Sequence, residues 1–153
     1  MATPSAFALR GDGRIELRLI SRAEAVRLHD LVLAKDGGLA GVRDNNALES
    51  ALYAPARYLY YANPSATLPE LAAVMAYAFA KGQHPFVDGN KRTAALLVPV
   101  FLRAHGIKWR PGHEELISKM LAIARAKSDE TSRQQVIEAT AFWIQLSEAE
   151  YAS

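Results

Sequence analysis

The apolar residues of this chain recur mainly at the three- to four-residue spacing of helices that bury one face. Val26, His29 and Leu33 show this spacing in the first such segment. The stretch after Thr67 is rich in alanine and aliphatic residues, as expected for a buried helix. The predicted helices cover residues 22–35, 45–54, 67–83, 91–104 and 113–127, with a last one capped by Ser132.

Capping signals mark the starts of several of these helices. Ser21 and Thr67 are each followed three residues later by glutamate, which is the spacing of a capping box. Asp44 is placed to cap the second helix, which we expect to end near Ala54 because Pro55 follows.

One segment, Ile15–Ile20, alternates apolar and charged residues and predicts a short strand or extended segment. No comparable second stretch occurs, and a lone strand cannot form a sheet unless it pairs in a hairpin or across a dimer. We therefore expect an all-α protein, a compact helical bundle with at most a short N-terminal strand or hairpin.

The composition predicts one globular domain. Of 153 residues, 50% are hydrophobic and 22% are charged, which excludes a disordered chain. A chain of this length usually forms one domain, so we expect an N-terminal arm at 1–18 and a single domain at 19–147. The absence of cysteine excludes a disulfide scaffold, a cysteine zinc site and a thiol nucleophile.

Charge and apolar runs limit the expected partners. The net charge is +2 and the basic residues are spread along the chain, so we expect no direct nucleic-acid binding. The longest apolar runs, Leu71–Ala80 and Ala94–Leu102, are too short to span a membrane. Residues 1–9 lack the basic start of a signal peptide. We expect a cytoplasmic protein without membrane contact.

The segment His84–Thr93, with the sequence HPFVDGNKRT, is the one stretch that does not fit a packed helix. Pro85 and Gly89 prevent it from being helical throughout, so it predicts a loop between two helices. The next helix then begins at Asn90 or Lys91 and presents free backbone amides and the positive end of its dipole. This helix start predicts an anion site.

Four side chains of this segment predict phosphate chemistry. Lys91 and Arg92 are cations where the helix dipole disfavours them, so their placement calls for an anion such as a polyphosphate. Asp88 supplies the hard oxygen that Mg²⁺ prefers, usually together with substrate phosphates. His84 is the only loop group that accepts a proton near neutral pH. This set predicts phosphoryl or nucleotidyl transfer from a nucleoside triphosphate to a hydroxyl.

The same segment closely resembles the motif H-P-F-x-[D/E]-G-N-x-R of the Fic/Doc superfamily, a long and specific pattern. Upstream, Gly41–Asp44 followed by Leu48–Leu52 resembles a signature of the Doc (death-on-curing) branch. The resemblance covers about residues 19–125 and implies the compact helical Fic/Doc core.

The resemblance also implies roles for the motif residues. His84 would be the general base that takes the proton from a target hydroxyl, and Asp88 would bind Mg²⁺. The residues that would contact the nucleotide are Gly89, Asn90, Lys91 and Arg92, of which the last three would also belong to the catalytic set.

Lys91 separates two activities within the superfamily. AMP-transferring Fic enzymes have glycine there, whereas Doc toxins have lysine and transfer the γ-phosphate of ATP. The resemblance therefore implies an ATP- and Mg²⁺-dependent protein kinase that modifies a hydroxyl of a protein such as elongation factor Tu and inhibits translation. It would be the toxin of a type II toxin–antitoxin module, neutralised by a cognate antitoxin protein. Gly89, where some Doc proteins have alanine, keeps AMP transfer open as the alternative.

A few residues outside the motif have two interpretations. Arg43 and Asp44 would shape a flap that holds the target peptide, and N-capping by Asp44 is an equal alternative. His29 lies on an apolar helical face and is interpreted as a core or capping residue, whereas His105 and His113 are interpreted as surface loop residues. The intact motif disfavours a non-catalytic binding module, and a DNA-binding role lacks a recognition helix.

Overall fold

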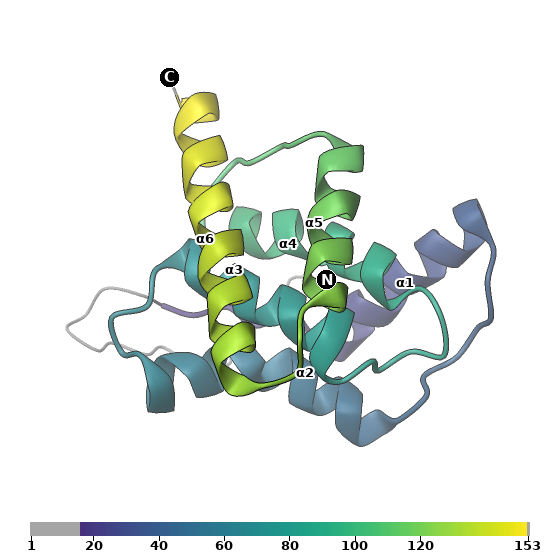
Figure 1. Ribbon diagram of the computed structural model, residues 1–153. Helices are drawn as coiled ribbons and strands as arrows, with labels where there is room; N and C mark the ends of the chain where they lie inside the picture. The colour runs from purple at the N-terminus through teal and green to yellow at the C-terminus, as the bar shows by residue number, and fades with distance from the viewer. Residues whose placement is uncertain (1–15, 153) are drawn as a thin grey trace.

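The computed structural model describes residues 16–152, and the side chains of residues 16–147. Between these limits the chain forms six α-helices and two π-helical turns (Figure 1). They are α1 (Arg22–Asp36), α2 (Asn45–Arg57), η1 (Tyr58–Ala62), α3 (Leu68–Tyr77), η2 (Ala78–Gly82), α4 (Asn90–Ala104), α5 (His113–Arg125) and α6 (Glu130–Ala152). The described residues contain no strand, only an isolated bridge, so the predicted all-α class is confirmed.

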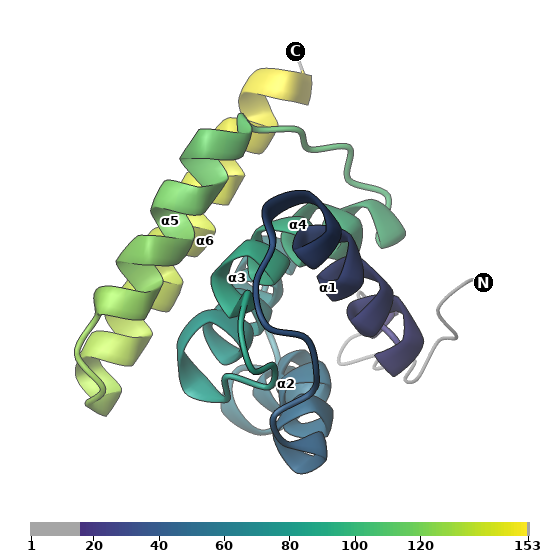
Figure 2. The same cartoon turned by 90° about the vertical axis from the view of Figure 1, so that its right-hand side faces the viewer.

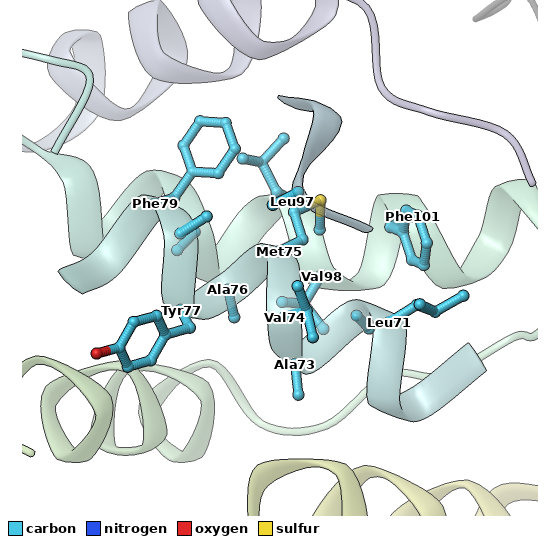
Figure 3. Close-up of a cluster of buried hydrophobic side chains, with 14 of the residues drawn as sticks. Leu71, Ala73, Val74, Met75, Ala76, Tyr77, Phe79, Leu97, Val98 and Phe101 are labelled. Atoms are coloured by element: carbon cyan, nitrogen blue, oxygen red, sulfur yellow. The ribbon is translucent and has the colours of Figure 1, made fainter. Parts of the chain in front are cut away.

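Helix α3 is the centre of the bundle. Every residue from Leu71 to Ala80 is buried, and α3 makes its most extensive contacts with α6 and then with α4. Helices α5 and α6 run side by side along one side of the molecule, and α1 and α2 lie on the opposite side (Figure 2). Helix α4 packs against both α3 and α5. The side chains of α3 interdigitate with Leu97, Val98 and Phe101 of α4 (Figure 3). The buried helix predicted after Thr67 is therefore the core element.

Both predicted capping boxes form in part. The Ser21 hydroxyl accepts the Glu24 N–H at 3.1 Å, and the Thr67 hydroxyl accepts the Glu70 N–H at 3.3 Å. The Glu24 carboxylate instead binds the Arg27 guanidinium, and the Glu70 carboxylate accepts hydrogen bonds from side chains of the preceding segment.

Two predicted helix boundaries are wrong. Pro55 does not end α2, which continues to Arg57 and then widens into η1, because the proline ring is buried and removes only one backbone donor. Ser132 does not cap the last helix. Asp129 does, through an oxygen that accepts the Ser132 N–H at 2.8 Å, so α6 begins two residues before Ser132, at Glu130.

The start of the described chain forms no strand. Residues 16–20 have no regular secondary structure, yet Leu17 and Leu19 are buried while Glu16 is exposed, as the alternation predicts. The Arg18 N–H donates to Nε2 of His105 at 2.9 Å. The rest of the predicted arm, including Ile15, lies outside the described residues.

The surface-loop interpretation of His105 is wrong. Its Nδ1 lies 2.8 Å from the Phe101 carbonyl oxygen, and its ring closes the end of α4 beside Arg18. Burial lowers the pKa of His105, so the neutral ring that accepts the Arg18 N–H is favoured. His113 is exposed at the start of α5. No described helix is both long enough and apolar enough to cross a membrane.

Candidate active site

A single loop between the turn η2 and helix α4 carries the predicted base and carboxylate. His84 is exposed, and its backbone has a φ of +47°, a left-handed conformation that costs a non-glycine residue roughly 1 kcal/mol. Its Nε2 lies 3.1 Å from the Ala80 carbonyl oxygen. When Nε2 carries the proton and donates it to that oxygen, Nδ1 keeps a lone pair and can act as a base.

Arg43 supports this left-handed backbone. Its Nε donates to the His84 carbonyl at 2.7 Å, and its Nη2 donates to the Gln83 carbonyl at 2.6 Å. Both carbonyls lie at the end of η2, where no further helical turn supplies backbone N–H groups to bind them. The two-pronged contact fixes the direction in which the His84 side chain leaves the loop.

The upstream segment 38–44 pairs with the loop along its backbone. Val42 and Phe86 form the isolated antiparallel bridge. The Arg43 N–H donates to the Pro85 carbonyl at 2.8 Å, and the Val87 N–H donates to the Gly41 carbonyl at 3.0 Å. The two segments that the sequence singled out separately therefore form one structural unit.

Asp88 is held by backbone amides from both segments. Its Oδ2 accepts the Leu39 N–H at 3.3 Å, and its Oδ1 accepts the Gly89 N–H at 2.9 Å. These two hydrogen bonds, with the Leu39 contribution the larger, lower the pKa of Asp88. The approach is possible because residue 38 is glycine: a Cβ there would lie 2.9 Å from Oδ2. Asp88 is therefore an ionised, preoriented carboxylate near neutral pH.

His29 of α1 supports the same loop from beneath. It is 2% exposed, its Nε2 lies 2.7 Å from the Asp88 carbonyl oxygen, and its ring stacks on Phe86 with centroids 3.9 Å apart. The core or capping interpretation is confirmed. The sequence did not show that His29 contacts the motif, because this contact joins residues 59 positions apart.

Helix α4 begins at Asn90, two residues after Asp88. Gly89 is its N-cap with a φ of +80°, and the first helical bond runs from the Thr93 N–H to the Gly89 carbonyl at 2.9 Å. By helix geometry, the amides of residues 90–92 are left without intrahelical acceptors. The Cβ position of Gly89 faces His29 and Val32, so this glycine serves the turn and its packing on α1.

The three polar residues at this helix start have different surroundings. The Asn90 side chain accepts the Phe86 N–H and donates to the Phe86 carbonyl, both at 2.9 Å, and so closes the loop on itself. Arg92 lies 3.6 Å from a carboxylate oxygen of Asp36 at the end of α1. Lys91 is exposed beside the free amides. The structure thus brings His84, Asp88 and the cationic start of α4 onto one connection.

Asp44 takes the capping role. Its Oδ1 accepts the Asn46 N–H at 2.8 Å and the Ala47 N–H at 3.2 Å, so the N-cap alternative is confirmed. A contact of Arg43 and Asp44 with a target peptide stays a prediction.

The donor set fits a magnesium ion that is held mainly by a substrate. Among the described residues, no cluster of three or more histidine or acidic side chains could hold a metal by itself. Asp88 offers one ionised carboxylate whose oxygens each accept one amide and keep lone pairs. One carboxylate together with substrate phosphates is a usual way to bind Mg²⁺.

A helical bundle that presents a histidine, a carboxylate and a helix N-terminus on one loop has the parts that an enzyme active site requires. The Fic/DOC family model matches residues 19–102, and the chain belongs to the Fic/DOC family. A relative from Escherichia phage P1, the "Protein kinase doc", is 37% identical over 93 residues. That alignment covers 60% of this chain and 71% of the relative. The resemblance to the Doc branch is thereby confirmed.

Proposed function

We propose that this protein is a Doc-type kinase toxin. It transfers the γ-phosphate of ATP to a threonine or serine hydroxyl of a protein such as elongation factor Tu and so inhibits translation. The observation that carries the proposal is Lys91 at the start of α4, on the same connection as the predicted base His84 and the ordered carboxylate Asp88. The similarity to a protein named as a kinase supports it.

The loop residues divide the reaction between them. His84, through its ring nitrogen with the free lone pair, takes the proton of the accepting hydroxyl. The hydroxyl oxygen forms a bond to the γ-phosphorus as the bond to the bridging oxygen breaks, and ADP leaves. The amides of residues 90–92, with Lys91 and Arg92, hold the phosphates and offset their charge.

Asp88 would hold the magnesium ion against the phosphates. When bound, Mg²⁺ supplies positive charge that stabilises the developing negative charge on the phosphate oxygens. The lowered pKa of Asp88 keeps its carboxylate ionised for this purpose.

The proposal also includes a cytoplasmic toxin–antitoxin pair. A cognate antitoxin protein would bind the chain and keep it inactive until the antitoxin is lost. Co-expression with a candidate antitoxin should restore growth that the toxin alone arrests.

Labelled nucleotides test the reaction type. The purified protein is incubated with elongation factor Tu and ATP labelled in either the γ- or the α-phosphate. Transfer of the γ-label alone is expected, and the His84→Ala variant should transfer none. Transfer of the α-label would instead establish the AMP-transferase alternative. If neither label moves, and His84→Ala arrests growth as wild type does, the enzyme proposal is wrong.

A further inference from the structure

A positively charged pocket lies beside the active-site loop and has no part in the chemistry above. Its cavity of about 370 Å³ is walled by the end of α2, by α3 with η2, and by the start of α6. Each wall contributes one cation, namely Arg57, Lys81 and Arg133. The lining contains no aspartate or glutamate.

The three cations are held by neutral groups. Arg57 donates to the carbonyl and hydroxyl oxygens of Ser50, and the Lys81 ammonium donates to the Ala124 carbonyl at 3.3 Å. Within the described side chains, none of the three forms an ion pair with a carboxylate. Their charge is therefore available to a ligand.

Arg133 is preoriented at the pocket. Its guanidinium lies 5.4 Å from the centroid of the Tyr77 ring, which stiffens a side chain that would otherwise be flexible. Figure 3 shows the Tyr77 hydroxyl pointing away from the aliphatic side chains of the core. A guanidinium over an aromatic ring still presents its N–H groups in a fork that fits a carboxylate.

The pocket lies next to His84, because both are in contact with the turn η2. Gln83 lines the pocket and directly precedes His84. The His84 ring rests on the Ala80 carbonyl, in the same turn whose Lys81 and Gly82 line the cavity. The cationic start of α4 is at the other end of the loop. A protein whose hydroxyl reaches His84 therefore places its neighbouring residues near the pocket, at about 3.3 Å per extended residue.

We infer that this pocket is a specificity subsite that binds an acidic side chain of the protein substrate, a few residues from the accepting hydroxyl. The inference rests on the proposed function, because it assumes a protein hydroxyl at His84. The three unpaired cations and the fork of Arg133 match a carboxylate, and the lining offers nothing to repel it. Such charge-assisted contacts select the partner as well as bind it.

Direct binding of a peptide tests the subsite without any phosphotransfer. The probe is a short fluorescent peptide with one threonine and flanking glutamates, compared with the same peptide carrying glutamines. Anisotropy is measured with the full-length His84→Ala variant at fixed salt. We expect the glutamate peptide to bind about tenfold more tightly, a ratio typical of losing one charged hydrogen bond.

Pocket variants locate the effect. Arg57→Gln and Lys81→Gln should each reduce the preference for glutamate several-fold, whereas Lys108→Gln, an exposed cation outside the pocket, should leave it unchanged. Circular dichroism checks that each variant is folded. If Lys81→Gln unfolds, Arg57→Gln alone tests the pocket, because Arg57 is exposed and its substitution does not disturb the core. Equal affinity for the two peptides would overturn the inference, and so would a loss of the glutamate preference in Lys108→Gln as large as in the pocket variants. Displacement of the fluorescent glutamate peptide by ATP but not by the unlabelled glutamate peptide would also overturn it.

The transfer reaction gives a second readout. With elongation factor Tu and γ-labelled ATP, Arg57→Gln should raise the KM for the protein while the kcat and the KM for ATP stay near wild type. A fall in kcat with unchanged KM would contradict a binding subsite. If no label moves with wild type but the glutamate preference is present, the proposed reaction fails while the pocket stands as a site for acidic peptides.

Discussion

At the scale of single residues, the geometry of the site depends on how closely Gly38 approaches Asp88. Gly38 has a φ of +124°, and a Cβ there would lie 2.9 Å from the Asp88 carboxylate. Neighbouring Gly37 also has a positive φ, of +77°, but its Cβ would meet nothing within 4 Å. Substitution by alanine therefore strains the backbone at both positions, but only the alanine at position 38 would also press on Asp88.

This pair gives the first prediction. Gly38→Ala should reduce phosphotransfer roughly ten- to a hundredfold, because it pushes the Asp88 carboxylate away from the position set by the Leu39 amide. Gly37→Ala should reduce stability through backbone strain alone, so we expect a lower melting temperature and near-normal activity. Equal losses of activity in the two variants, measured by label transfer across a magnesium titration, would contradict this explanation.

Arg43 gives the second prediction. Arg43→Lys keeps the charge but cannot bind the Gln83 and His84 carbonyls with a rigid fork, so the His84 backbone relaxes. We expect kcat to fall about tenfold or more with little change in the KM for ATP, and stability to fall by about 1 kcal/mol. Steady-state kinetics and urea unfolding measure both, with the exposed Arg103→Lys as control. A normal kcat would show that Arg43 does not position His84.

The sequence predicted the motif residues because they are contiguous, and it could not predict their supports. The spacing of His84 and Asp88 in one loop follows from the chain itself. The stacking of His29 on Phe86 and the ordering of Asp88 by Leu39 depend on two distant segments meeting, which no local pattern records. The clamp that Asn90 places on its own loop joins residues only four positions apart, but the residue type alone does not show which groups its amide binds.

At the scale of elements, His105 ties the N-terminal segment to α4. Its ring accepts the Arg18 N–H only when that nitrogen is unprotonated. The pKa of His105 is lowered in the folded state, so protonation favours the unfolded chain. The stability from this contact is full above the unfolded pKa of about 6.5 and is lost as the pH falls toward the lower folded value.

The third prediction follows from that sign. The free energy of unfolding in urea should fall as the pH drops below about 6.5, and the fall should be smaller in His105→Gln, whose amide does not titrate. His113→Gln, at an exposed position, should keep the wild-type slope. Parallel slopes in all three proteins would show that His105 does not link protonation to folding.

The helix boundaries show where local signals are sufficient. Serine and threonine caps at Ser21 and Thr67 were predicted because a cap is read from three neighbouring residues. Pro55 was misjudged because its local cost is outweighed by burial of the helix around it, which is a property of the tertiary fold. Asp129 accepts both the N–H and the hydroxyl hydrogen of Ser132, so Ser132 already lies inside the first turn of the helix and does not cap it.

At the scale of the whole molecule, the core around α3 determines stability. Phe101 of α4 is fully buried in this cluster, whereas Phe142 of α6 is 61% exposed. The sequence predicted the all-α class and a buried third helix. It did not predict that α3 packs most extensively on α6, since helix pairing depends on shape as well as periodicity.

These two phenylalanines give the fourth prediction. Phe101→Ala should lower the free energy of unfolding by about 3–5 kcal/mol, because it removes apolar contacts and leaves a cavity. Phe142→Ala should change it by less than about 0.5 kcal/mol. Urea unfolding of both variants measures the difference. A similar loss in the two would mean that α4 does not contribute to the core as described.

The backbone pairing between the upstream segment and the loop has one more consequence. The amide hydrogens of Arg43 and Val87 lie on different segments, yet each is bonded across the same contact. Both become accessible to solvent only when the segments separate, so their deuterium exchange should proceed at matched rates. These two protons are therefore an internal reporter of how often the candidate site opens, readable by NMR in the resting protein with no nucleotide or substrate added.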